Sequence, residues 1–452
     1  MTENNALEQA INRHFEGDLD AAAQVYLSVL EDDPINAVAL HYYGIYLHQI
    51  GKHNEAIDKL QLSCALAPEN ASWHNDLGNV LFNLSQYEMA VSAYSDALEA
   101  NAADHMVWNN MGAALLRLGK SEEAAEAFSR AVDISPEFVS ALQNLGVIYE
   151  QAGDKMKASH YQCRAYVVPP MEGKSRDLVG ISFYFLGRLD EAAQLYREWL
   201  QDEPENAVAE HMLAACSQKE VPARASDRYI EQHFDKYAET FEANLLESLA
   251  YKGAAMISTG LSAISAPSNQ FSVVDIGCGT GICGPVLEPY SSSLVGVDLS
   301  GKMLEKAALR GCYDLLVRGE VGGYLMANPQ AYDLVAAADT LIYFGDLAPL
   351  FEKVSAALRS GGYFIFTVES LEAAQVREKG YLLHASGRYK HGCNYVIRRL
   401  APASLELVHH SFHTIRTEVG VDVPGIVFVA RKITDHSERK FPKTTQEAGD
   451  GY

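Results

Sequence analysis

The chain has 452 residues, of which 48% are hydrophobic, and its 36 lysines and arginines against 59 aspartates and glutamates give a net charge of −23. This length exceeds one ordinary domain and predicts two or three. The acidity lies in the first half: through Pro222 there are 14 basic and 33 acidic residues, a balance of −19, and the remainder carries 22 and 26, a balance of −4. Such a charge repels phosphate backbones and argues against nucleic-acid binding.

The sequence predicts no association with a membrane and no structural metal. It contains no apolar stretch of the length that crosses a bilayer, and residues 1–12 lack the basic and apolar regions of a secretory signal. The seven cysteines are scattered without a CxxC pair or zinc spacing. Their odd number and dispersion favour a reducing, cytoplasmic location over a disulfide scaffold.

Four columns of residues recur every 34 positions across residues 3–206. One column is proline with a single alanine: Pro34, Pro68, Ala102, Pro136, Pro170 and Pro204. A second is glycine: Gly44, Gly78, Gly112, Gly146 and Gly180. A third marks turns: Gly17, Gly51, Ser85, Gly119, Gly153 and Gly187. The fourth is alanine: Ala22, Ala56, Ala90, Ala124, Ala158 and Ala192.

Each column has a physical role in paired helices. Glycine and alanine allow two helices to approach closely, the turn glycine reverses the chain, and proline ends the second helix. The pattern resembles the tetratricopeptide repeat, which implies six helix pairs stacked into a superhelix. Gln162 replaces the aromatic residue in the fifth repeat, and residues 207–218 are expected to form a capping helix.

The resemblance implies a concave groove that binds proteins or peptides. Its expected lining residues are His41, Asn75, Asn79, Asn109, Asn110 and Gln143. Asparagines can donate to and accept from an extended peptide backbone, but they can equally be satisfied surface amides. The array could instead mediate self-association or pack on the second domain.

Residues 219–226 interrupt the helical pattern and predict a linker, since they contain Pro222 and small residues. Aromatic residues then recur on one helical face: Tyr229, Phe234, Tyr237 and Phe241. This helix is expected either to dock on the core or to form a lid over a cofactor. In the second case Tyr229 and Tyr237 would contact the cofactor.

A nucleotide-cofactor pattern begins at Phe271. A β-branched strand ends in Asp275 and turns through Gly277, Gly279 and Gly281, and a second strand ends in Asp298. A dinucleotide-binding GxGxxG motif that starts at Gly277 would fail at position 282, and the later match that starts at Gly279 is displaced by two residues.

The chemistry of the strand end separates the two cofactor classes. S-adenosylmethionine is cationic and lacks phosphates, so the Asp275 carboxylate suits it and would oppose a pyrophosphate. Asp298 can accept the ribose hydroxyls in either class. Cys278, Leu299 and Met303 lie in the same segments and complete the expected cofactor site.

Later segments predict a doubly wound α/β domain. Strands at residues 332–339 and 363–369 and a final pair near 414–418 and 425–431 indicate a seven-stranded, mostly parallel sheet with a reversed last strand. We therefore expect a helical array over residues 3–218, a linker over 219–226, an α/β domain over 227–433 and a disordered tail over 434–452.

The motifs DIGCGTG, GVDLSGKML, AADTLIYFGDL, SGRYKHGCNY and RTEVGVDVPGIVFV resemble class I methyltransferases that carry a tetratricopeptide array. The resemblance implies S-adenosylmethionine as cofactor and Rossmann-like topology. The acceptor is left open between a small molecule and a protein side chain. A scaffold that binds the cofactor without turnover is the main alternative, and a nicotinamide oxidoreductase is a third.

Residues 380–395 are expected to form a polar loop that covers the substrate. We hypothesise that His391 acts as a base or hydrogen-bond partner and that Arg388 binds an acceptor carboxylate. The alternative is that His391 is structural. Asp339, after the fourth strand, is a further catalytic and cofactor candidate. The sequence from Asp339 to Tyr343 replaces the NPPY motif of amino-group methyltransferases, which argues against a nucleobase amine as acceptor.

Overall fold

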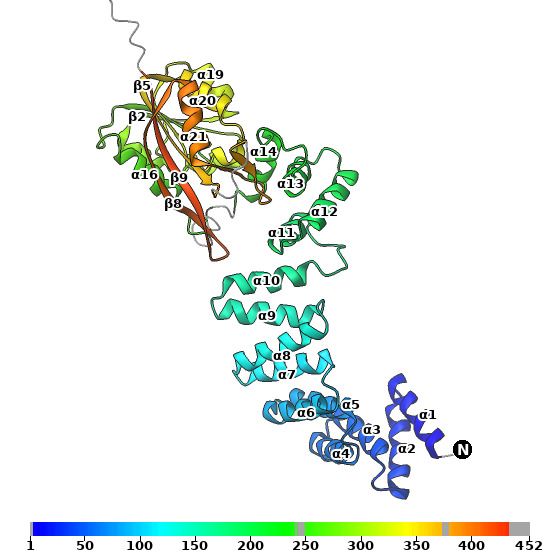
Figure 1. The fold of residues 1–452 in the computed structure, drawn as a ribbon. Helices are drawn as coiled ribbons and strands as arrows, with labels where there is room; N and C mark the ends of the chain where they lie inside the picture. The colour runs from blue at the N-terminus through cyan, green and yellow to red at the C-terminus, as the bar shows by residue number, and fades with distance from the viewer. Residues whose placement is uncertain (1–2, 240–241, 243–248, 373–378, 434–452) are drawn as a thin grey trace, which may run out of the picture. The chain divides into compact units, whose positions relative to one another are not determined.

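The computed structural model describes residues 3–239, 242, 249–372 and 379–433. The chain divides into two compact units, Met1–Gly173 and Lys174–Tyr452 (Figure 1). None of the helices in these described ranges is long and apolar enough to cross a membrane.

The first unit consists of consecutive antiparallel helix pairs, as the repeat predicts (Figure 1). The helices are α1 (Glu3–Glu16), α2 (Leu19–Asp32), α3 (Ala37–Gln49), α4 (His53–Leu66), α5 (Ala71–Asn83), α6 (Tyr87–Ala100), α7 (His105–Arg117), α8 (Ser121–Ile134), α9 (Val139–Gln151) and α10 (Lys155–Tyr166). Asparagine or aspartate side chains cap α3, α5, α7 and α10 by accepting backbone N–H groups.

The glycine column exists because large side chains of the second helix occupy the space beside it. A Cβ added at Gly78 would lie 2.5 Å from the Tyr94 ring, and one at Gly112 would lie 2.8 Å from the Phe128 ring. Tyr94 and Phe128 are fully buried. The two helices of a pair can therefore pack closely only because a glycine on one helix lies opposite a large side chain on the other.

The turn column adopts left-handed backbone at every position, with φ between 59° at Ser85 and 92° at Gly17. Glycine reaches this region without strain, and serine at position 85 does not. The six-fold recurrence of this turn confirms the predicted helix–turn–helix repeat.

The second unit begins with α11 (Arg176–Phe185), α12 (Leu189–Asp202) and α13 (Ala207–Ser217), followed by α14 (Asp227–Tyr237) and α16 (Gly253–Ser262). The predicted linker, residues 219–226, contains no helix, and Arg224 forms a single β-bridge with Phe344. The expected capping helix is α13.

The sheet of this unit contains nine strands among the described residues. They are β1 (Phe271–Ile276), β2 (Ser291–Asp298), β3 (Leu315–Arg318), β4 (Tyr332–Ala337), β5 (Leu358–Ser370), β6 (Tyr381–Leu383), β7 (Tyr389–His391), β8 (Leu405–Glu418) and β9 (Val421–Lys432). Shorter helices connect them: α17 (Gly284–Leu287), α18 (Gly301–Ala308), α19 (Val321–Ala327), α20 (Ala348–Ala357) and α21 (Cys393–Leu400).

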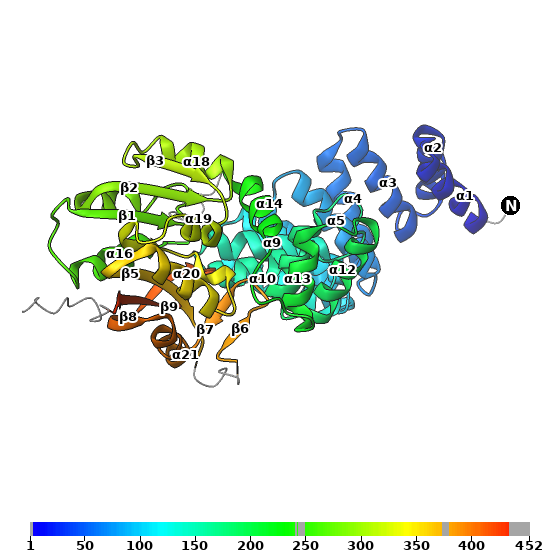
Figure 2. The same ribbon diagram turned by 90° about the horizontal axis from the view of Figure 1, so that it is seen from above.

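The sheet is mostly parallel with a reversed last strand, as predicted, but its described part contains nine strands and not the predicted seven, because residues 380–395 contribute the short strands β6 and β7. Strands β3, β2, β1, β4 and β5 are adjacent and parallel, and β9 pairs antiparallel with both β5 and β8 (Figure 2). The reversed last strand is thus β9. Because β1, β2, β4 and β5 are parallel, their carboxyl ends lie along one edge, where ligands bind in this class of sheet.

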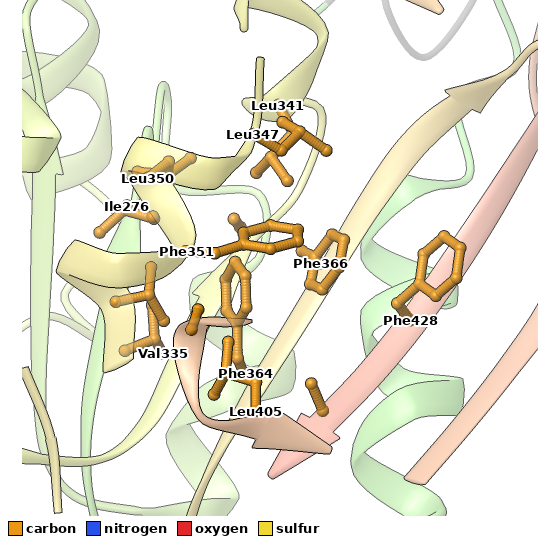
Figure 3. Packing of buried hydrophobic residues seen from close by; sticks show 14 of the residues in the cluster. Ile276, Val335, Leu341, Leu347, Leu350, Phe351, Phe364, Phe366, Leu405 and Phe428 are labelled. Atoms are coloured by element: carbon orange, nitrogen blue, oxygen red, sulfur yellow. The ribbon is translucent and has the colours of Figure 1, made fainter. Parts of the chain in front are cut away.

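A hydrophobic core on one face of the sheet fixes these strands. Phe364 and Phe366 of β5 stack 4.4 Å apart between ring centroids, and Phe351 of α20 contacts both (Figure 3). Phe428 of β9 stacks on Phe366 at 5.2 Å. All four rings are fully buried, so this core joins the reversed strand to the parallel part of the sheet.

Residues 380–395 differ from the predicted polar loop. They form the β6–β7 hairpin and the start of α21, and β7 pairs with the carboxyl end of β5 through Glu369 and Ser370. Alternating residues of the hairpin, such as Leu383 and Tyr389, are buried. Strands of only three residues are too short to give a recognisable alternating pattern in the sequence, which explains the difference.

The last helices of the array pack on this hairpin within the second unit. His211 of α13 hydrogen-bonds through Nε2 to the Gly387 carbonyl at 2.8 Å, and Gln218 donates to the Leu383 carbonyl at 2.7 Å. Tyr184 of α11 contacts the ring of His384. The compact units divide the chain at residue 173, so the sixth helix pair, α11 and α12, and the capping helix α13 belong to the second unit and not to the first.

Candidate cofactor and acceptor site

The turn after β1 leaves open space at its centre. Gly277, Gly279 and Gly281 all have positive φ, at 69°, 54° and 77°. A Cβ at Gly277 would meet Thr340 at 2.4 Å and one at Gly281 would meet Tyr313 at 2.9 Å, whereas one at Gly279 has nothing within 4 Å. The outer glycines are thus required by packing, and Gly279 exposes its backbone to a ligand.

Asp298 holds the two strand ends together. Its Oδ2 accepts the Gly279 N–H at 2.9 Å and its Oδ1 accepts the Ser300 N–H at 2.9 Å. The carboxylate is 8% exposed, and burial raises its pKa. A carboxylate has about four acceptor positions, so capacity remains for two hydroxyl groups of a ligand.

Asp275 is almost completely buried, at 1% exposure. Burial raises its pKa to about 7, and Tyr313 opposes the shift by donating its hydroxyl to Oδ2 at 2.7 Å. A desolvated carboxyl of this kind gains from a nearby cation. Sequence reasoning did not identify Tyr313, since nothing in its local pattern indicates this contact.

Helix α14 lies over the same edge. Its Asp235 accepts the Ser300 hydroxyl at 2.5 Å, and its Glu231 pairs with Arg318 at the end of β3. On another side, Phe234 contacts the Tyr343 ring, 5.7 Å between centroids. The helix is therefore tied to both the β2 side and the β4 side of the edge.

Tyr229 and Tyr237 of α14, both expected to contact the cofactor, have different surroundings. Tyr229 is buried and stacks on His211 of α13, with centroids 4.0 Å apart, so it serves as a docking residue. Tyr237 lies one turn beyond His233, 5.2 Å between ring centroids. Phe241 lies outside the described residues.

The remaining cofactor candidates are Cys278, which follows the strand β1, and Leu299 and Met303, which follow the strand β2. Cys278 and Met303 are buried, and Leu299 is half-buried. Burial raises the pKa of the Cys278 thiol, which makes it a packing residue rather than a nucleophile. All seven cysteines of the chain are free thiols.

An ion-pair network lies beyond the ends of β4 and β5. Arg416 of β8, 1% exposed, contacts Asp339 through Nη1 at 3.2 Å, Glu418 through Nε at 2.7 Å, and Glu369. Arg388 pairs with Glu418 at 2.5 Å. The network joins two arginines to three carboxylates.

The network has its own electrostatics. The two arginines hold the pKa of Glu418 at about 2 despite its burial. Burial raises the pKa of Asp339, and Arg416 opposes that shift. Asp339 has a positive φ of 56°, which strains a residue other than glycine. Its side chain keeps 20% exposure, so it is within reach of a ligand.

Arg416 and Glu418 were absent from the predicted site. Both lie in the RTEV segment that the sequence assigned to a strand of the final pair. The sequence signal that could have identified them is a pair of charged residues at alternating positions of a strand, because such residues lie on the same face of the sheet.

The geometry does not favour His391 as a base. The side chain is fully buried, and Nε2 donates to the carbonyls of Phe344 and Gly345 at 2.8 and 3.2 Å. Burial lowers the pKa of His391 to about 4. The ring stacks on Tyr395 at 6.0 Å, and these contacts fit the structural alternative.

Arg388 lies at the site but is already paired. Its side chain is 27% exposed and contacts Glu418 and, at 3.7 Å, Glu369. An acceptor carboxylate would have to compete with these two acids. Among the described residues, no group of three or more histidines, cysteines or acids is arranged to hold a metal ion.

Two family descriptions match the chain. A methyltransferase domain matches residues 274–366, and the tetratricopeptide repeat matches residues 7–71 and 75–137. The first match includes the glycine turn, Asp298 and Asp339. The second covers the first two pairs of repeats.

Two methyltransferases match this chain over about a hundred residues. A probable S-adenosylmethionine-dependent methyltransferase of Saccharomyces cerevisiae is 40% identical over 21% of this chain and 34% of its own length. A ubiquinone biosynthesis O-methyltransferase of Nitrosomonas europaea is 30% identical over 22% of this chain and 44% of its own. The chain thus covers less than half of these relatives.

A crystal structure of a Mesorhizobium loti S-adenosylmethionine-dependent methyltransferase is 23% identical, with a TM-score of 0.32, and covers 38% of this chain and 96% of its own. The methyltransferase domain implies S-adenosylmethionine as cofactor, and the cationic preference of Asp275 agrees with it. The chain therefore combines an array of tetratricopeptide repeats with a methyltransferase domain.

Proposed function

We propose that the second unit binds S-adenosylmethionine at the carboxyl ends of β1 and β2 and transfers its methyl group to an acceptor near Asp339. The observation that carries the proposal is the pairing of Asp298 with the Gly279 amide beside open space. S-adenosylmethionine supplies a methyl group on a positively charged sulfur, which needs alignment with the acceptor more than activation.

The residues around the turn have separate roles in this proposal. Asp298 accepts the ribose hydroxyls with the acceptor capacity that the two amides leave free. Gly279 has no side chain, so the cofactor can approach the protein backbone closely at this position. Asp275 attracts the positive charge without direct access to water. Helix α14, tied to Ser300 through Asp235, covers the cofactor and excludes water.

On the acceptor side, Asp339 is the residue we assign to proton removal. It is partly exposed at the end of β4, and burial raises its pKa toward the range useful to a base. A hydroxyl or ammonium acceptor would lose its proton to the Asp339 carboxylate, with Arg416 balancing the charge before transfer. Arg388 is a positioning residue that orients Glu418 and Glu369.

The acceptor is a small molecule or a protein side chain. The O-methyltransferase relative supports hydroxyl compounds as the first class to test. The array supports a protein or peptide partner, because its asparagines form a ladder: Asn110 donates to Asn75 and Asn79 at 3.2 Å, and Asn144 donates to Asn109 at 3.4 Å. Their unused amide groups can bind a peptide backbone.

His41, also predicted in this groove, is buried against Trp73 and is not part of that ladder. We place the protein in the cytoplasm, supported by its free thiols.

A cofactor-binding scaffold without turnover is the second candidate. The full pairing of Arg416 and Arg388 with internal acids favours it, because a satisfied network leaves fewer groups for an acceptor.

Calorimetric titration of the full chain with S-adenosylhomocysteine tests cofactor binding, with NAD as the negative ligand. Asp298→Asn keeps an amide acceptor and should weaken binding at least tenfold, whereas Asp314→Asn, which alters an exposed acid of the same unit, should not. If the folded wild type does not bind, the proposal is wrong.

Turnover is then tested with labelled methyl donor and a panel of hydroxyl, amine and carboxyl acceptors. Asp339→Asn should lower kcat about a hundredfold or more with S-adenosylhomocysteine affinity preserved. Tight cofactor binding without methyl transfer to any acceptor of the panel or to any protein of a cell extract would favour the cofactor-binding scaffold without turnover.

A further inference from the structure

A hollow of about 680 Å³ lies in the first unit, outside the methyltransferase domain. Its walls come from α4 and α6, the second helices of two consecutive repeats, and α5 lies between them. The asparagine ladder uses different residues of α5, so the hollow is a separate feature of the array.

His74 is the unusual residue of this hollow. It is 8% exposed, yet neither ring nitrogen has a hydrogen-bond partner. The nearest acid is Asp96, whose Oδ2 lies 3.8 Å from Nδ1, beyond hydrogen-bond distance. A buried polar group without a partner costs about 1–3 kcal/mol. In a neutral imidazole one ring nitrogen donates and the other accepts, so a ligand that donates an N–H group to the accepting nitrogen would remove part of that cost.

The rim of the hollow is acidic. Glu69, Asp96 and Glu99 line it, and none of its lining residues is lysine or arginine. Asp96 is 55% exposed, so its charge is available to a partner. Across residues 1–173 there are 9 basic and 24 acidic residues, a balance of −15. The local and the overall charge both attract a cation.

The walls are apolar. Leu77 and Leu81 are buried at the base, and Met89 is 43% exposed at the side. Methionine adapts its shape to a guest, and the stem of a long basic side chain packs well on such surfaces. Cys64 also lines the hollow, and burial raises the pKa of its thiol to about 11, so it acts as a packing residue.

We propose that this hollow binds an arginine side chain from a basic segment of a protein partner. The guanidinium is planar and presents several N–H donors at once, so it can bond to His74 and Asp96 together. Its methylene stem would cover Leu77 and Met89. A lysine has a single compact charge and would satisfy only one of these acceptors at a time.

The first experiment observes Met89 directly in the full chain. The protein has ten methionines, so a spectrum of ¹³C-methyl-labelled methionine is small, and Met89→Leu identifies the signal. The probe is an acetylated, amidated peptide with one arginine among four alanines. The matched control replaces that arginine with citrulline, which has nearly the same shape but no charge.

The expected result is a saturable shift of the Met89 signal with the arginine peptide and at least a fivefold weaker response with citrulline or lysine. An absent shift, or an equal one with citrulline, would overturn the proposal. A Met89 shift that grows with protein concentration alone would mean that a second copy fills the hollow, which also overturns it.

Variants then locate the binding. Asp96→Asn removes an exposed charge and should weaken the arginine peptide about fivefold. His74→Phe keeps an aromatic ring, removes the acceptor and should have a similar effect. Glu122→Gln, on the exposed face of α8, is the matched charge control and should bind as the wild type does. Wild-type affinity in both Asp96→Asn and His74→Phe would contradict the assigned contacts.

Discussion

Asp275→Asn is expected to stabilise the protein and to weaken its cofactor binding. Asp275 is 1% exposed, and burial raises its pKa from 3.8 to about 7. A carboxyl whose pKa is raised by folding contributes its stability fully below pH 3.8 and loses it as the pH rises through 7. Asparagine removes that loss and can still accept the Tyr313 hydroxyl.

The magnitude follows from linkage. One pKa unit corresponds to about 1.4 kcal/mol, so the raised pKa of Asp275 lowers the free energy of unfolding, relative to its value below pH 3.8, by about 2 kcal/mol at pH 5.5 and by about 4 kcal/mol at pH 8.5. The free energy of unfolding of Asp275→Asn should therefore gain about 2 kcal/mol on the wild type between these two pH values. The Asp314→Asn control should show no such gain.

Urea unfolding at each pH measures the effect. Trp199 of α12 is the only tryptophan of the second unit, so its fluorescence follows that unit when Trp73 and Trp108 are replaced by phenylalanine. The variant should also bind S-adenosylhomocysteine more weakly, and the loss should grow with pH because only the wild type gains a negative charge. Parallel stability curves for the variant and the wild type would refute the reasoning.

Three further predictions concern packing and turns. Gly112→Ala should lower the stability of the first unit by about 1–2 kcal/mol, because the added Cβ would lie 2.8 Å from Phe128 and this clash outweighs the higher helix propensity of alanine. Urea unfolding measures the change, and a stabilised variant would contradict the packing argument. Ser85→Gly should raise stability by up to about 1 kcal/mol, since φ is 59°; an unchanged or lower midpoint would show that the turn is not strained. His391→Gln should lower the melting temperature but leave the pH dependence of kcat unchanged, because His391 donates to two carbonyls; a lost ionisation in the profile would restore it as a base.

The repeat array and the cofactor turn could be predicted from the sequence because each rests on local geometry. A positive φ favours glycine, and a helix crossing favours a small residue, so both requirements recur in the sequence at the repeat period. The same holds for Gly277 to Gly281 between two strands. The mostly parallel sheet with its reversed last strand was also predictable, because alternating strands and helices favour parallel crossovers.

The contacts of the proposed acceptor side could not be predicted, although Asp339 and Arg388 were candidates, because the contacting residues are distant in the sequence. Arg416 meets Asp339 across 77 positions and Glu369 across 47, and no local pattern signals either contact. His391 was expected in the site because histidine is a frequent base, but a short strand turns its ring toward backbone carbonyls. Residue type indicated possible chemistry, and burial determined whether that chemistry was available.

The contact between α13 and the β6–β7 hairpin has a consequence for how this architecture can change. Since His211 and Gln218 hydrogen-bond to Gly387 and Leu383, the capping helix α13 fixes the hairpin that carries Arg388. The first five helix pairs belong to the other compact unit. The contacts of α13 with the hairpin lie within the second unit, so a change in the number of repeats before residue 173 would leave those contacts in place.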